Sequence, residues 1–331
     1  MCLESTKKIE NEKYVLDRVV SAGGGALFED FADFPRYILL ETVNNCTARC
    51  PMCGIEEWRK RIKANYMEDM LFFKVVDEII AHREIVQKIA LFVGNEPLLD
   101  RKLAQRIRYL KENGIKKVNF STNGSLMDYN RAIEILESRV DHVNVSIDSL
   151  DKSVYEAMRR PLKFEKVLGN ALQFINLRNA MNFKTAIRIS VIKNSRLFKD
   201  KDINEVKDFW FKFLDKDKGD SIRIDELHES FKDKESDISS LMYDNEKRGC
   251  TWKKYDSTPC YTLWNTITIK ADGQVALCCV DQCRQFTLGN LQNESIAENW
   301  KNNKTRNLIK EKHLMKGRGC VDVCKNCIAW L

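Results

Sequence analysis

The chain has 331 residues, 44% hydrophobic and 31% charged, which is enough for one large core or for a large domain with a small one. Its net charge of +7 is modest, and its basic residues are scattered among acidic ones, so nothing indicates a nucleic-acid-binding protein. The polar start MCLESTKKIENEKY has no secretory apolar segment, and no apolar run reaches the roughly 18–20 residues that span a bilayer. We therefore expect a cytoplasmic protein with no membrane partner.

Short apolar runs alternate with amphipathic stretches between residues 37 and 225. The runs predict strands at 37–43, 88–93, 117–122, 141–147, 186–192 and 221–225. Stretches 68–82 and 103–114 carry apolar stripes at helical spacing, and Gly114 is placed to cap the second helix. Strands that alternate with helices predict a parallel sheet with right-handed crossovers. Six such units are too few for a closed eight-unit barrel, so we predict an α/β fold with a partial (β/α)6 barrel.

The predicted domains are an N-terminal extension (1–36), the partial barrel (37–230), a polar linker (231–259) and a small cysteine-rich domain (260–331). The last contains TITIKADGQVALCC (266–279), in which Asp272-Gly273 predicts a β-hairpin with a two-residue turn. That turn would pair Ile267 with Cys278 and Ile269 with Ala276, so that Cys278 shares a face with two isoleucines. A helix-like segment follows the hairpin.

Twelve cysteines in a chain without an export signal favour metal ligation or redox chemistry over a disulfide framework. Three lie at 46–53 and eight at 250–327, which indicates two cysteine centres. Cys46, Cys50 and Cys53 follow the first predicted strand directly, and chemistry in parallel sheets gathers at the carboxyl ends of strands. The basic segment WRKRIK (58–63) comes next, either as a solvated helix face or as a contact for an anionic ligand or an acidic redox partner.

Three close thiols are one short of a closed tetrahedral metal site. They could be buried thiols or a zinc site that lacks its fourth ligand, although structural zinc sites usually close their tetrahedron. An iron–sulfur cube held by three thiolates would instead leave one iron open for an exogenous ligand. This last interpretation explains why the set stops at three.

With this cysteine spacing, the sequence resembles the radical S-adenosylmethionine (SAM) superfamily, and the stretches VGNEPLLD (93–100), STNGSLM (121–127) and VSIDSLDKSVYEAMRR (145–160) fit it in order. The resemblance implies that the second-strand loop holds the methionine amino group, and that Ser146 and Arg159, with Arg160 as a substitute, reach the ribose and carboxylate of SAM. Met52 stands where many members carry an aromatic residue near the adenine. The implied cofactor-binding residues are Met52, Gly94, Asn95, Glu96, Pro97, Asn123, Ser146 and Arg159.

The C-terminal region resembles the SPASM or twitch extension of these enzymes. Its thiols Cys260, Cys278, Cys324 and Cys327 would close an auxiliary [4Fe–4S] cluster with no open iron. Zinc is the alternative, but seventeen residues separate the first pair, unlike the usual C-x2-C units. The spare thiols Cys250, Cys279, Cys283 and Cys320 could serve a second auxiliary cluster, be buried hydrophobic residues, or donate a hydrogen atom.

The resemblance implies an enzyme whose reduced cluster cleaves SAM to a 5′-deoxyadenosyl radical, which abstracts a substrate hydrogen atom. If the auxiliary cluster accepts the substrate electron, the outcome is a two-electron oxidation, and we expect a small polar substrate such as a sugar or aminocyclitol. The alternatives are a ribosomal-peptide maturase that forms thioether or carbon–carbon bonds, a radical epimerase with a cysteine hydrogen donor, and a non-catalytic iron–sulfur carrier or sensor. Flavodoxin or ferredoxin is the expected electron donor.

Overall fold

The computed structural model describes residues 2–23, 33–55, 59–60, 62–193, 200–226, 256–281, 286–325 and 327. Two compact units share the chain: unit 1 comprises Met1–Leu40, Met67–Lys88 and Asp244–Leu331, and unit 2 comprises Glu41–Tyr66 and Ile89–Tyr243. Among the described residues, no helix combines the length and the hydropathy needed to span a membrane.

Parallel strands form the sheet of unit 2, in the order β6-β5-β4-β3-β2. They are β2 (Lys88–Ala90), β3 (Val118–Thr122), β4 (His142–Ser146), β5 (Ala186–Lys193) and β6 (Ser221–Glu226). Each lies within or next to a predicted apolar run, so those strand predictions are confirmed. The carboxyl ends of these strands therefore meet at one edge of the sheet.

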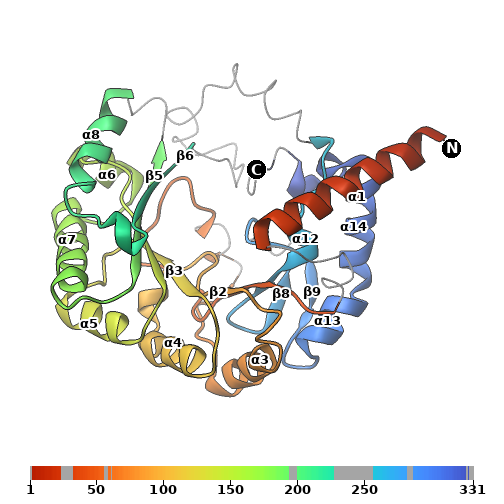
Figure 1. Cartoon of the computed structure of the whole chain (residues 1–331), viewed down its shortest axis with the longest axis horizontal. Helices are drawn as coiled ribbons and strands as arrows, with labels where there is room; N and C mark the ends of the chain where they lie inside the picture. Colours follow the sequence, from red (N-terminus) through yellow and green to blue (C-terminus); the bar gives the residue numbers. More distant parts are fainter. Residues whose placement is uncertain are drawn as a thin grey trace. The chain divides into compact units, whose positions relative to one another are not determined.

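Helices cover one face of this sheet (Figure 1). They are α4 (Leu103–Glu112), α5 (Tyr129–Glu137), α6 (Lys152–Met158), α7 (Phe164–Ala180) and α8 (Asp200–Trp210), with the short 3-10 turns η2 (Pro97–Leu99) and η3 (Lys216–Lys218). The predicted helix at 103–114 is confirmed as α4, which buries Leu103, Ile107 and Leu110. Gly114 follows it at φ +84°, and Ile115 N–H reaches the Leu110 carbonyl at 3.1 Å, which is a Schellman cap.

A buried ion pair connects α7 to the strands of unit 2. The guanidinium of Arg178 and the carboxylate of Asp220 are both fully buried and pair in a bidentate way. Asp220 also accepts hydrogen bonds from Ile187 N–H in β5, at 2.7 Å, and from Asp215 N–H, at 2.8 Å. One carboxylate therefore connects α7, β5 and the turn that leads into β6.

Unit 1 combines N-terminal and C-terminal segments of the chain. Its elements are α1 (Cys2–Gly23), β1 (Tyr37–Leu40), α3 (Asp69–Ala81), α12 (Thr262–Asn265), β7 (Thr266–Ile269), β8 (Gln274–Ala276), β9 (Thr287–Asn290), α13 (Ile296–Asn302), α14 (Lys304–Lys316), η4 (Arg318–Cys320) and η5 (Asp322–Cys324). Strands β1 and β7 pair in parallel, and β7, β8 and β9 continue the sheet in antiparallel order. Strand β1 and helix α3 confirm the predictions at 37–43 and 68–82, and α13 and α14 form the helical segment predicted after the hairpin.

Helix α1 lies in the N-terminal extension, for which no secondary structure is predicted. It packs against α14, where Asn11 Nδ2 donates a hydrogen bond to the Leu314 carbonyl at 2.8 Å. Val15 and Val19 are buried, one and two helical turns after Asn11. The predicted linker at 231–259 lies outside the described residues except for 256–259.

The predicted hairpin exists, but its predicted register is wrong. Thr268 pairs with Ala276 and Ile269 with Val275, which shifts the register by one residue. The loop has three residues instead of two, because Lys270 N–H bonds the Gln274 carbonyl at 2.9 Å and Gly273 adopts φ +82°. A shift of one residue exchanges the faces of a strand, so Cys278 does not fall on the face of the two isoleucines.

The Arg178–Asp220 pair gives a stability prediction. Replacing Asp220 with alanine (Asp220→Ala) leaves the Arg178 charge buried without its partner, so the free energy of unfolding should fall by about 3–5 kcal/mol. Urea denaturation measures this change. The matched control is Glu165→Ala, which removes the exposed pair with Lys152 and should change stability little. Equal losses of stability in the two variants would contradict the stabilising role of the buried Arg178–Asp220 pair.

Candidate functional site

The loop with three cysteines is ordered by local hydrogen bonds. Cys46 N–H donates to Asn45 Oδ1 at 2.8 Å, and the Cys46 sulfur accepts from Ala48 N–H at 3.3 Å. Cys53 N–H donates to the Cys50 carbonyl at 2.9 Å, which closes a turn around the half-buried Met52. This turn keeps the second and third thiols close together.

Burial keeps these three thiols protonated. Burial, followed by the negative charge of Glu96, raises the pKa of Cys46 to about 12. Burial is also the main cause that raises the pKa of Cys53 to about 11 and the pKa of Cys50 above its ordinary value. The thiolates form when a cation offsets the burial, as a bound metal does, and the binding of the metal then releases protons.

The loop after β2 places a buried carboxylate beside the cysteine loop. Glu96 is 1% exposed and accepts hydrogen bonds from Thr122 Oγ1 at 2.7 Å, Asn123 N–H at 2.7 Å and Leu98 N–H at 3.1 Å. Its own N–H donates to the Asn45 carbonyl at 2.8 Å. Burial raises the pKa of the Glu96 carboxyl, although the three hydrogen bonds oppose this shift. A carboxylate has about four acceptor positions, so one remains for a further donor such as an amino group.

The predicted neighbours of Glu96 also lie in this loop. Asn95 Oδ1 accepts from Val93 N–H at 2.9 Å, whereas its Nδ2 is buried without a hydrogen-bond partner among the described residues. Gly94 is half-buried, and Pro97 is buried at the start of η2. A buried donor without an acceptor fits a loop that binds a polar ligand.

Asn123 joins the third strand end to the cysteine loop. Its Nδ2 lies 3.0 Å from Thr47 Oγ1 and 3.6 Å from the Cys46 sulfur, and its N–H binds Glu96. Thr47 in turn bonds Ser125 at 2.9 Å. The structure thus brings Cys46, Glu96 and Asn123 together, as their positions at strand ends predict.

Arg159 lies beside the second thiol. Its guanidinium forms a two-bond pair with Asp148, whose Oδ1 also accepts from Ile192 N–H at 2.9 Å. Arg159 Nη1 is 4.0 Å from the Cys50 sulfur. Arg160, the suggested substitute, is exposed. Ser146, at the end of β4, is half-buried, and its hydroxyl makes no hydrogen bond within the described part of the chain.

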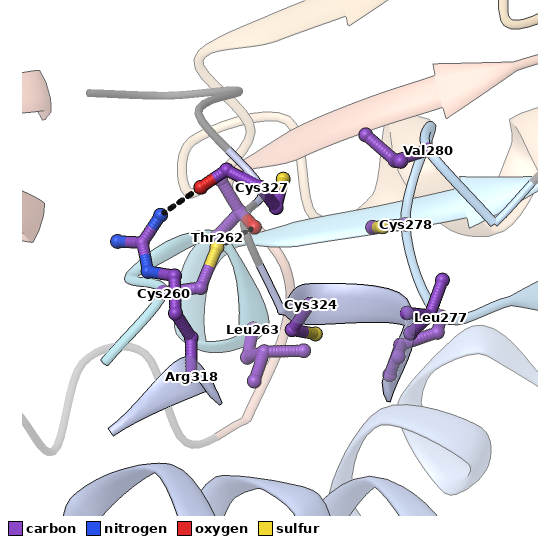
Figure 2. Close-up of a pocket in the computed structure, with 10 residues that line it drawn as sticks. Cys260, Thr262, Leu263, Leu277, Cys278, Val280, Arg318, Cys324 and Cys327 are labelled. Carbon is purple, nitrogen blue, oxygen red and sulfur yellow. Dashed lines mark hydrogen bonds between the residues drawn. The ribbon is translucent and has the colours of Figure 1, made fainter. Parts of the chain in front are cut away.

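Four thiols of unit 1 line one cavity. Cys260 precedes α12, Cys278 follows β8, and Cys324 and Cys327 come from the C-terminal turns (Figure 2). Burial raises the pKa of Cys278 and Cys324, and the neighbouring thiols add to both shifts. Among the described residues, no three metal-binding side chains converge closely enough for a single ion. The four thiols surround a space instead, which suits a cluster of several iron atoms.

Two family models match these two regions. A model of the radical SAM superfamily matches residues 40–208, half of the chain. The chain belongs to the radical SAM superfamily. A model of the SPASM iron–sulfur cluster-binding domain matches residues 260–328. These two domains imply a SAM-binding [4Fe–4S] cluster, an auxiliary cluster and SAM itself as cofactors, and the thiols of both regions fit these groups.

Curated relatives of this radical SAM enzyme include GTP 3′,8-cyclases. The protein from Limosilactobacillus fermentum is 26% identical over 194 residues, which are 55% of this chain and 52% of the relative. The protein from Rhizobium leguminosarum is 25% identical over 236 residues, 70% of this chain and 64% of the relative. The chain therefore spans less than two thirds of either relative.

Solved structures share the fold at low identity. BtrN in complex with AdoMet and 2-DOIA has a TM-score of 0.56 and 16% identity, with coverage of 89% of this chain and 93% of BtrN. Streptococcus suis SuiB bound to its precursor peptide SuiA has a TM-score of 0.64 and 15% identity, with coverage of 89% and 71%. These likenesses confirm the predicted fold class, a partial barrel followed by a cysteine-rich region.

Several residues that order the two sites of this radical SAM enzyme are not among those predicted from the sequence. Asp148 and Thr122 stand at or just after strand ends, a position that could have drawn attention to them. Asn45 connects the cysteine loop to the Glu96 loop by backbone and side-chain bonds, which no sequence pattern indicates. Arg318 lines the four-thiol cavity.

The spare thiols differ in their surroundings. Cys279 adjoins Cys278 and is half-buried, but it does not line the four-thiol cavity. Cys320 is exposed, and its sulfur donates to the Gly317 carbonyl at 3.0 Å. Cys250 and Cys283 lie outside the described residues.

Arg318 braces the backbone around the four-thiol cavity. It is fully buried and donates to the carbonyls of Thr258 at 3.2 Å and Pro259 at 2.9 Å. It also donates to the Cys327 carbonyl at 3.3 Å (Figure 2). No carboxylate pairs with it among the described residues. Its positive charge opposes the rise in the pKa of Cys324. Arg318 thus holds the segments before Cys260 and at Cys327 and directs a positive field toward the thiols.

Removal of one thiol set should leave the other cluster in place. The triple substitution Cys46→Ala, Cys50→Ala and Cys53→Ala should lower the iron and sulfide content by about half. Anaerobic iron and sulfide analysis, with electron paramagnetic resonance (EPR) in the presence and absence of SAM, measures this. The triple variant should retain a signal that SAM does not change. The matched control is the exposed Cys320→Ala, which should keep the full iron content. Complete loss of iron from the triple variant would contradict two independent centres.

Arg318 should raise the reduction potential of the auxiliary cluster, because a nearby positive charge stabilises the added electron. In the background of the triple variant, Arg318→Gln should shift the midpoint potential to a more negative value. Arg318→Lys, which keeps the charge, should shift it less. A redox titration followed by EPR measures the three potentials. Equal potentials would show that Arg318 only braces the backbone.

Proposed function

We propose that this radical SAM enzyme oxidises a small polar molecule by two electrons at a C–H bond. The observation that carries the proposal is the cavity lined by Cys260, Cys278, Cys324 and Cys327. Four thiolates complete a cluster without an open iron, so such a cluster is suited to electron transfer and not to substrate ligation. An auxiliary cluster of this kind is a built-in acceptor for the second electron of an oxidation.

The proposed SAM site lies at the strand ends of unit 2. Cys46, Cys50 and Cys53 hold the SAM-binding cluster, and the remaining acceptor position of Glu96 takes the methionine amino group. Ser146 offers a hydroxyl that has no other partner among the described residues to the ribose or carboxylate of SAM. The other residues of the proposed SAM site are Met52, Gly94, Asn95, Pro97, Asn123 and Arg159.

In this proposal Arg159 places a positive charge beside the Cys50 thiol. Asp148 neutralises part of its charge and fixes its orientation, and the Nη1 that remains faces the Cys50 sulfur. When bound, the reduced cluster supplies the electron that cleaves SAM and releases the 5′-deoxyadenosyl radical, which abstracts the substrate hydrogen. The chain itself binds, orients and excludes water around that chemistry. We expect flavodoxin or ferredoxin as the external electron donor.

Two relatives define the alternatives. BtrN was solved with AdoMet and 2-DOIA, a small molecule, and this chain covers 93% of its length. SuiB was solved with a precursor peptide, so cross-linking of a peptide is the second candidate function. Epimerisation would need a thiol that returns a hydrogen atom, for which Cys250, Cys279, Cys283 and Cys320 are the candidates.

Deuterium transfer tests the proposed function. The reconstituted enzyme, reduced with dithionite, should form 5′-deoxyadenosine from SAM, and a deuterated substrate should transfer label into it. Sugars, aminocyclitols, their acids and phosphates, and candidate peptides are compared by mass spectrometry. The triple cysteine variant is the negative control. A small-molecule product lighter by two hydrogens supports the proposal, whereas an isomer of unchanged mass, or a peptide that loses two hydrogens by forming a cross-link, would contradict it.

A further inference from the structure

The face of the unit 2 sheet opposite its helices is polar. In β4 and β5, Val143, Val145, Ile187, Ile189 and Val191 are buried, whereas the residues that alternate with them are half-buried. Central parallel strands that are covered on both faces normally read as continuous apolar runs. The alternation in β4 and β5 therefore indicates that, among the described residues, this second face is not packed against an apolar layer. In a barrel-like fold such a face adjoins the active site.

Hydrogen bonds join the polar side chains of this face. Asn144 Nδ2 donates to Ser121 Oγ at 3.0 Å, and Ser190 Oγ donates to Asn144 Oδ1 at 2.6 Å. Strand register places Ser190 opposite Ser146, which belongs to the proposed SAM site. The polar face and the SAM site are therefore continuous within unit 2.

Arg188 lies on this face, two residues before Ser190. It is half-buried, and its Nε donates to Ser221 Oγ at 3.2 Å. No carboxylate bonds it among the described residues, whereas the neighbouring Arg223 pairs with Asp225 at 2.7 Å. Burial lowers the pKa of Arg188, the charge of Arg223 acts in the same direction, and the charge of Asp225 opposes both. The half-buried guanidinium thus has no carboxylate hydrogen-bonded to it among the described residues, and an anionic ligand would supply one.

We propose that Arg188 binds an oxyanion group of the substrate, a carboxylate or a phosphate. Arginine presents paired N–H donors that match the geometry of both groups. This inference rests on the proposed function and narrows the small polar substrate to an acid or a phosphate ester, such as a sugar acid or sugar phosphate. A cationic aminocyclitol is disfavoured, because Arg188 and Arg223 would repel it.

Strand geometry gives the placement of the substrate. Two residues along a strand span about 6–7 Å, so the anion at Arg188 would lie about that far from the level of Ser146 and Ser190. The rest of the substrate would then extend toward the carboxyl ends of the strands, where SAM is proposed to bind. A molecule of roughly the length of a monosaccharide spans this distance.

Anion binding tests the proposal directly. Inorganic phosphate and succinate are titrated into the reconstituted protein with SAM by isothermal titration calorimetry, with glycerol as the uncharged probe. Arg188→Gln should weaken binding of the preferred anion by about tenfold to a hundredfold, the usual effect of losing a charged hydrogen bond. Arg188→Lys should retain part of the affinity. Arg223→Gln, on the same face, should weaken binding less, because Arg223 already has a carboxylate partner.

The outcomes separate this inference from the proposed function. If the wild type binds phosphate more tightly than succinate, we infer a phosphorylated substrate. If it binds succinate more tightly, we infer a substrate with a carboxylate. Equal affinities of the wild type and Arg188→Gln, a larger loss in Arg223→Gln, or no anion binding by the wild type would overturn the inference. Dithionite-driven SAM cleavage without substrate is measured in parallel and should persist in Arg188→Gln. A wild type that cleaves no SAM would overturn the proposed function, whatever the anion titrations give.

Discussion

Both sites depend on the cost of burying a thiolate. Burial and neighbouring negative charge raise the pKa values of Cys46 and Cys53 in the cysteine loop of unit 2 and of Cys278 and Cys324 in the cavity of unit 1. Near neutral pH these thiols stay protonated unless a metal compensates their charge, so cluster binding and thiol ionisation occur together. Positive charge lies beside both thiol sets: Arg159 faces Cys50, Arg49 and Arg159 both act on Cys53, and Arg318 acts on Cys324. These cations are held differently. Arg159 has a carboxylate partner, whereas the partners of Arg318 among the described residues are backbone carbonyls.

The SAM site has a second structural requirement, because its loops leave separate strands and must meet in one place. Glu96 meets this requirement through bonds to the end of β3 and to Asn45 in the cysteine loop. Its carboxylate is costly to bury, and the three donors around it offset that cost. A residue that organises three loops has little freedom to vary in position. The acceptor position that remains is fixed with it, which is what orientation of a bound amino group requires.

The sequence was sufficient for features that depend on local pattern. Apolar runs gave the strands, the stripe on 103–114 gave α4 and its Gly114 cap, and cysteine spacing gave both thiol sets. The hairpin register failed because Asp-Gly fits both a two-residue turn and a three-residue loop with glycine last, and only the packed strands distinguish them. Asp148 and Arg318 are not predicted from the sequence, because their partners are backbone groups and side chains that only the folded chain brings close. Such contacts depend on tertiary structure and leave no periodic signal.

The alternation in β4 and β5 was visible in the sequence, yet its functional meaning required the sheet. Read alone, HVNVS and AIRISVIK predict half-buried strands, as in a sheet with one face in water. In the centre of a parallel sheet with one face covered by helices, the same pattern indicates that the polar side chains line the interior of the partial barrel. Within this superfamily the cofactors supply a shared radical chemistry, so the substrate must be selected by side chains of this interior. Arg188, which no carboxylate hydrogen-bonds among the described residues, lies beside serines and an asparagine on this face and would give it a preference for anions that the cofactors cannot provide.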